Sequence, residues 1–150
     1  MQKPSRVKFY LLNVFAMVSL FSPLLPWMSY GVGSKTGIDI AIRSTYIIAI
    51  ASIGLLLISF LLFKTTTMKK FFLILALMFS GVIFSIYLYE IVRIAYQTTI
   101  ANSLPVEMFG VVSLSAKEIH IGYGLWLGVG ISFLSLLLNF IAMRAKGDKT

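Results

Sequence analysis

The sequence has no cysteine, and only 12% of its 150 residues are charged. The absence of cysteine excludes a disulfide scaffold, thiol chemistry, a thiolate-bound metal and a lipoprotein anchor. The scarcity of charge argues against an ordinary soluble domain, in which about 25% of residues are charged. Because 59% of the residues are hydrophobic, too little polar surface remains to cover a water-soluble core, and a disordered chain is excluded as well. The composition therefore predicts an integral membrane protein.

Four apolar runs predict four membrane spans, at about residues 9–28, 44–63, 71–93 and 121–143. Each run is close to the roughly 20 residues that a helix needs to cross a bilayer. The runs are continuous rather than alternating, which favours helices over a small β-barrel. We therefore predict an all-α membrane protein, a single four-helix transmembrane bundle over residues 1–150 with outer loops at about 29–43 and 94–120. Pro23 and Pro26 are expected to bend or end the first span.

The basic residues predict the orientation of the bundle. Nine of the 13 Lys and Arg residues flank the N-terminus, the turn between the second and third spans, and the C-terminus. The positive-inside rule places these segments in the cytoplasm. We therefore expect a multi-pass protein of the plasma (inner) membrane with both termini cytoplasmic, and we attribute the net charge of +8 to topology rather than to nucleic-acid binding. A cleaved secretory signal within residues 1–31 is the alternative for the first span.

Aromatic and ionisable side chains gather near the predicted outer interface. Eight of the nine Tyr and Trp residues fall there, whereas an aromatic belt normally occupies both interfaces. A belt and an outward docking surface are both consistent with this asymmetry. Glu90 and Arg93, spaced i, i+3, can pair on one helix face and either solubilise a helix end or orient a partner's charge. The candidate outer-face binding residues are Trp27, Tyr30, Tyr87, Tyr89, Glu90, Arg93, His120, Tyr123 and Trp126.

The loops carry weaker signals. Partial alternation over residues 111–121 suggests a short extracellular β-hairpin, for which residues 38–42 could supply a companion segment. Glu118 and His120 provide only two local ligands, so we expect no metal site. Residues 31–37 are rich in glycine but lack the spacing of a phosphate-binding loop.

Small residues within the spans predict close helix packing. Gly124, Gly128 and Ser132 follow one another at four-residue steps, and Ser80 and Gly54 lie in the third and second spans. Such residues let helices approach closely, within the bundle or at a seam between two copies. No ionisable residue lies between the predicted interfaces, whereas proton-coupled transporters and pumps place one there.

In outline the chain resembles claudin-like and other tetraspan proteins. The resemblance consists of four spans, cytoplasmic termini, two outer loops and the tripeptide Gly124-Leu125-Trp126. In claudins a Gly-Leu-Trp element lies in the first outer loop with two cysteines behind it, whereas here it begins the fourth span and no cysteine follows. The resemblance implies a topology, and no function is carried over from it.

Three functions are consistent with the sequence. The outer-face pattern favours a non-enzymatic accessory, interaction or protective protein that binds a partner or lipid. The first alternative is a small oligomeric transporter or pore for neutral or hydrophobic solutes. The second is a membrane-interface enzyme on a lipid-linked substrate, with Glu90, Arg93, Glu118 and His120 as acid–base candidates. We expect the lipid bilayer and either a membrane protein or a second copy as partners, and neither a cofactor nor nucleic acid.

Overall fold

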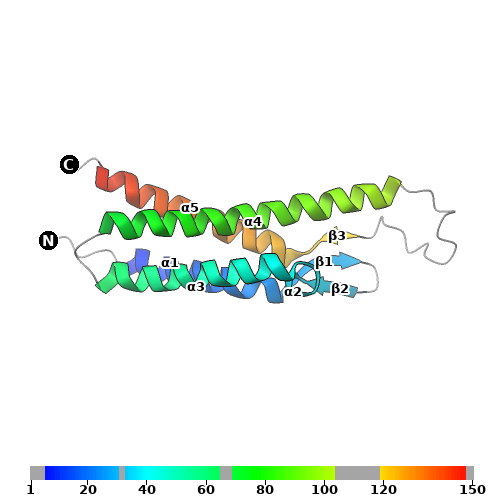
Figure 1. Cartoon of the computed structure of the whole chain (residues 1–150), viewed down its shortest axis with the longest axis horizontal. Coiled ribbons are helices and arrows are strands. Elements are labelled where there is room, and N and C mark those ends of the chain that lie inside the picture. The colour runs from blue at the N-terminus through cyan, green and yellow to red at the C-terminus, as the bar shows by residue number, and fades with distance from the viewer. Residues whose placement is uncertain (1–5, 31–32, 65–68, 104–118, 148–150) are drawn as a thin grey trace.

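The computed structural model describes residues 6–30, 33–64, 69–103 and 119–147, which are mostly helical (Figure 1). Within these residues, three helices are long and apolar enough to cross a membrane: α3 (Ile42–Lys64), α4 (Lys69–Ser103) and α5 (Tyr123–Gly147). A shorter apolar helix, α1 (Arg6–Phe21), continues into a single 3-10 turn, η1 (Ser22–Leu24). The structure therefore has the character of an α-helical membrane protein.

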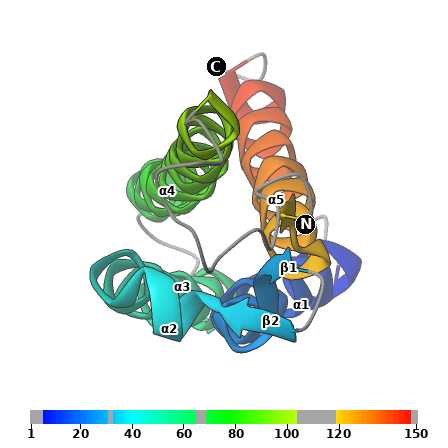
Figure 2. The same ribbon diagram turned by 90° about the vertical axis from the view of Figure 1, so that its right-hand side faces the viewer.

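The helices form a ring in which each contacts two neighbours. Helix α1 packs on α3 and α5, and α4 packs on the same two helices (Figure 2). The start of α1, the end of α3, the start of α4 and the end of α5 lie at one end of the ring, which we call the terminal end (Figure 1). The strands and a short helix lie at the opposite end, which we call the sheet end.

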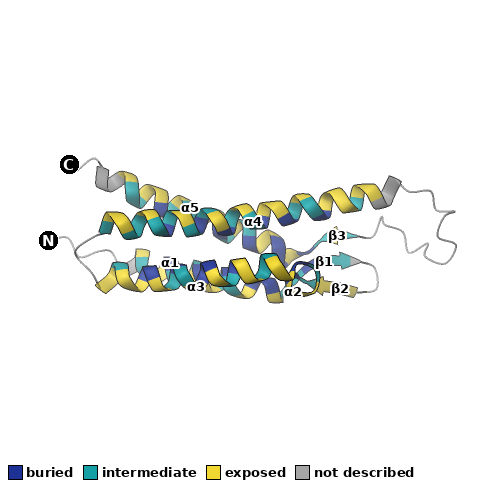
Figure 3. Cartoon of the chain, in the orientation of Figure 1, coloured by how far each residue is buried: buried dark blue, intermediate teal, exposed yellow. Residues whose placement is uncertain are grey.

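The ring is apolar outside, and its interior combines aliphatic and aromatic side chains with small and polar ones. Large apolar side chains such as Ile50 and Met78 are more than 60% exposed, and exposed positions run along the outside of the helices (Figure 3). In the interior, Ala16, Ala51 and Ala76 are buried, as are several serines. Lipid tails accept an apolar exterior, and small interior residues let helices approach closely. This pattern is typical of a bundle that lies in a bilayer.

A three-stranded antiparallel sheet closes the sheet end. Its order is β2 (Gly33–Thr36), β1 (Pro26–Tyr30) and β3 (His120–Ile121), with Met28 opposite both Lys35 and Ile121. The pairing of β1 with β2 shifts between Pro26 and Met28, which leaves Trp27 as the extra residue of a bulge. A bulge redirects a side chain relative to the alternation of a regular strand.

Residues 38–42 are not a strand. Residues 38–40 belong to α2 (Gly37–Ile40), Ala41 follows the end of α2, and Ile42 begins α3, whereas the partner of β3 is β1. The physical reason is local, because the Asp39 carboxylate accepts hydrogen bonds from the Thr36 backbone N–H at 3.0 Å and the Thr36 hydroxyl at 2.8 Å. This side-chain pairing stabilises a helical turn at its first residues. Residues 111–118 of the expected hairpin lie outside the described residues.

Helix α4 is longer than the third predicted span, which ended at residue 93. It has 35 residues and ends at Ser103. Residues 94–103 contain no charge, glycine or proline, so nothing in them interrupts a helix, and the helix ends two residues before Pro105. At about 1.5 Å per residue, α4 is roughly 52 Å long, against roughly 35 Å for the 23 residues of α3.

Candidate functional site

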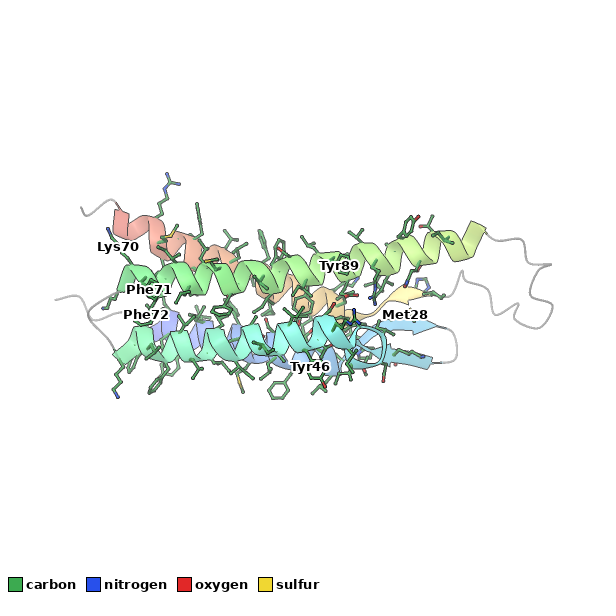
Figure 4. All side chains as sticks on the ribbon, in the orientation of Figure 1. Met28, Tyr46, Lys70, Phe71, Phe72 and Tyr89 are labelled. Carbon is green, nitrogen blue, oxygen red and sulfur yellow. The ribbon has the colours of Figure 1, made fainter. Side chains whose placement is uncertain are left out.

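The nine candidate residues do not form one surface. Trp27, Tyr87 and Glu90 are completely buried, so their side chains do not contribute to an exposed surface, and their role in binding stays a prediction. Four candidates are exposed: Tyr89 on α4 (Figure 4), His120 on β3, and Tyr123 and Trp126 at the start of α5. Tyr30 belongs to β1, and its side chain lies outside the described residues.

Trp27 and Tyr87 form an aromatic core beneath the sheet. Their ring centroids are 5.7 Å apart. The Tyr87 hydroxyl donates to the Ser19 carbonyl at 2.8 Å, and the Trp27 indole N–H donates to the Ser22 carbonyl at 3.1 Å. Because every polar atom of the two rings has a partner, their burial carries no unpaired donor. The core ties the sheet to α1, η1 and α4.

Glycines provide the space that these two rings occupy. A Cβ atom on Gly37 would lie 2.5 Å from the Trp27 ring, and one on Gly128 would lie 2.3 Å from the Tyr87 ring. Gly124 packs against Leu25 in the same way, at 2.6 Å. The ridge of small residues on α5 therefore faces the interior of its own bundle at Gly124 and Gly128, rather than a second copy. Ser132 is also buried, and its hydroxyl donates to the Gly128 carbonyl at 2.7 Å.

An ion pair between a buried Glu90 and a half-buried Arg93 lies at the sheet end of α4. The Arg93 guanidinium Nη2 is 3.0 Å from Glu90 Oε2, and it donates to the Ile40 carbonyl at 2.9 Å. The other carboxylate oxygen, Oε1, accepts a hydrogen bond from the Ser44 hydroxyl. Oε2 lacks a hydrogen bond of good geometry, and the buried Arg93 Nε has no partner within the described residues. These four residues join α4 to α2 and to the first turn of α3.

The acid–base arrangement that an interface enzyme would need is not formed by the described residues. His120 pairs with Ser29 across the sheet and is exposed, whereas Glu90 is fully buried in its ion pair. No hydrogen bond or ion pair joins these two residues in the part of the chain that the structure describes. That part also contains no group of three or more His, Asp or Glu side chains that could hold a metal. Glu118 lies outside the described residues.

A second polar cluster lies between α4 and α5, deeper in the bundle. The Asn139 amide donates to the Ser80 hydroxyl at 2.8 Å, and Ser80 and Ser135 are hydrogen-bonded at 3.0 Å. On α3, Gly54 packs against Phe79 of α4, with 3.2 Å between its ideal Cβ and that ring. These contacts hold the helices of the bundle together.

One exposed aromatic feature stands on α4. Tyr89, Val92 and Tyr96 are 60%, 65% and 66% exposed, and their spacing of three and four residues places them on one face of the helix. We call these three residues the α4 stripe. From the sequence, Tyr89 is a candidate binding residue, Tyr96 is counted only among the aromatic residues near the outer interface, and Val92 is not singled out.

No protein-family model, curated protein or solved structure matches the chain. The fold and the three long apolar helices identify the class as α-helical membrane proteins.

Proposed function

We propose that the protein is a four-span protein of the plasma membrane with both termini in the cytoplasm. On this proposal it is a non-enzymatic accessory or protective protein that binds another membrane protein through its sheet end. The apolar stretch of α1 and η1, Lys8–Leu24, is the first span along the chain and brings the number of spans to four. Its 17 residues are about 26 Å long, close to the roughly 30 Å of bilayer hydrocarbon. The basic residues of the terminal end support the orientation.

The observation that carries the proposal is that α4 continues past the start of α3, alongside the sheet (Figure 1); we call the residues of α4 after Glu90 its projecting part. Ser44, in the first turn of α3, contacts Glu90, so this contact marks the level at which α3 begins. Helix α4 continues for 13 residues past Glu90, which is about 20 Å. Val92 and Tyr96 are exposed on this projecting part.

The position of the projection favours a protein partner over lipid. The 23 residues of α3 already match the thickness of the hydrocarbon. Side chains beyond the start of α3 therefore reach the headgroup level and the water above it, where exposed apolar area is unfavourable. Tyrosine is enriched at protein interfaces because it buries a large ring and keeps a hydroxyl for hydrogen bonding.

The aromatic core supports such a role by making the sheet end rigid. Trp27 is fixed by its ring contact with Tyr87, by its hydrogen bond to Ser22 and by the close approach of Gly37. A preformed surface loses less conformational entropy on binding than a flexible one. The α4 stripe therefore extends from a fixed base.

Photocrosslinking tests the proposal. A benzophenone amino acid in place of Tyr96 should give an adduct with another membrane protein in intact cells, which mass spectrometry identifies. Tyr46 on α3 is the matched control, because it is 64% exposed and outside the projecting part. Equal adducts at positions 46 and 96, or lipid adducts alone at position 96, would overturn the proposal.

A further inference from the structure

We propose that the terminal end of the bundle binds the headgroups of anionic phospholipids. Its basic collar consists of Lys64 at the end of α3, Lys69 and Lys70 at the start of α4, and Arg144 near the end of α5. Lys64, Lys70 and Arg144 are exposed, and Lys69 is half-buried. Three of the helices thus contribute a cation to the same end of the molecule.

The charge of the collar is not compensated within the described part of the protein. None of these four cations is in an ion pair there, and the ion pair of Glu90 and Arg93 lies at the sheet end. The sequence has no Asp or Glu between residues 40 and 89 or between 119 and 147. Four like charges at one end repel one another, so an anion bound among them stabilises the arrangement.

The surroundings of the collar match a ligand that has both a phosphate and an acyl chain. Phe63 and Phe71 are 46% and 57% exposed beside the lysines, and Lys70 and Phe71 lie together at the start of α4 (Figure 4). The Phe63 ring stacks on that of Phe9 at 4.6 Å, which joins α3 to α1 at this level. Lysine stems can lie along apolar surface while their ammonium groups reach the headgroup phosphates.

This arrangement favours a lipid over a soluble anion. The cations lie at the ends of helices whose outer faces are apolar, so a phospholipid can satisfy the charge and cover the exposed rings at the same time. Anionic lipids attract basic residues near the membrane surface by about 1 kcal/mol for each Lys or Arg. That energy corresponds to about fivefold in affinity for each charge.

Native mass spectrometry of the full chain in neutral detergent tests this proposal. Phosphatidylglycerol and phosphatidylcholine are titrated against the wild type and against the variant K64Q/K69Q/K70Q/R144Q. The wild type should prefer phosphatidylglycerol, and the variant should lose that preference by at least about tenfold. The matched control is K35Q/R43Q, which removes two exposed cations from the sheet end, and it should keep the preference.

Three results would overturn the proposal. The wild type could bind both lipids equally, in which case the collar is only hydrated. The control variant could lose the preference as fully as the collar variant, which would mean that net charge alone matters. Inorganic phosphate could displace phosphatidylglycerol at equal concentration, in which case the acyl chains contribute nothing. Circular dichroism checks that each variant is folded. Failure of the crosslinking at Tyr96 would leave this test unaffected, because the crosslinking concerns the sheet end and the lipid titration concerns the terminal end.

Discussion

Substitution of Gly128 by alanine tests the aromatic core directly. The added Cβ would lie 2.3 Å from Cε1 of Tyr87 and 2.5 Å from its Cζ, well inside van der Waals contact. The Tyr87 ring has little room to retreat, because it is fully buried against Trp27 and its hydroxyl is bonded to Ser19. The substitution should therefore push α5 away from α4.

The expected loss of stability follows from two opposing terms. Overpacking in a well-packed interior typically costs about 1–3 kcal/mol. Replacement of glycine by alanine in a helix returns up to about 1 kcal/mol through helix propensity. The matched control is Gly130→Ala in the same helix, because an added Cβ at Gly130 has no heavy atom within 4 Å. Gly128→Ala should thus be less stable than Gly130→Ala by about 1–3 kcal/mol.

Unfolding by sodium dodecyl sulfate, followed by helical circular dichroism in mixed micelles, compares the two variants. A double-mutant cycle with Tyr87→Ala assigns the cause, because removal of the ring should abolish the penalty of Gly128→Ala. Equal stability of Gly128→Ala and Gly130→Ala would refute the argument. A penalty that persists in the Tyr87→Ala background would show that another contact, rather than this ring, requires the glycine.

Three further predictions concern the polar contacts. Glu90→Gln should lower the free energy of unfolding by about 2 kcal/mol, which is less than the loss for a fully buried pair because Arg93 is 30% exposed. The double variant Glu90→Gln/Arg93→Gln should recover part of the lost stability, because no unpaired charge remains. A double variant no more stable than Glu90→Gln in the detergent titration would contradict this prediction. Asn139→Ala should lower the free energy of unfolding by about 0.6–1.7 kcal/mol, because it removes the hydrogen bond to Ser80. This loss should exceed that of Ser132→Ala, because the Ser132 hydroxyl donates only to carbonyls of its own helix. Equal losses for the two variants would refute this ranking. The pKa of Asp39 is lowered mostly by the hydrogen bond from the Thr36 hydroxyl and to a smaller extent by that from the Thr36 N–H. The contribution of Asp39 to stability is therefore complete above the usual carboxyl pKa and is lost as the pH falls through the lowered pKa. An NMR titration of the Thr36 amide should report this loss, and Asp39→Asn should remove the transition.

The class of fold could be predicted from the sequence because it depends on composition and run length. The second predicted span, 44–63, differs from α3 by two residues at its start and one at its end. The fourth, 121–143, overlaps nearly all of α5. A continuous apolar run leaves a membrane helix as its only favourable structure, so little else is needed to locate it.

The direction of the aromatic side chains could not be predicted in the same way. Trp27 faces inward because a bulge in β1 redirects it and because Gly37 leaves room for its ring. Tyr87 faces inward because Gly128, 41 residues later in the chain, leaves room for it. A single sequence shows that aromatic residues are near an interface, but the spatial pairing of distant glycines and rings decides which of them is buried.

The burial of Glu90 bears on whether its carboxylate could couple transport to the movement of a charge. The sequence placed this carboxylate at the end of a span, whereas α4 continues for 13 residues beyond it. A carrier needs a carboxylate that can exchange its partner during transport. Glu90 instead accepts a hydrogen bond from Ser44 on one oxygen and faces Arg93, three residues along its own helix, with the other. If Glu90 exchanged Arg93 for another partner, the Arg93 charge would lose its carboxylate and the start of α3 would lose its contact with α4. The ion pair is therefore better suited to holding α4 against the start of α3 than to carrying a solute.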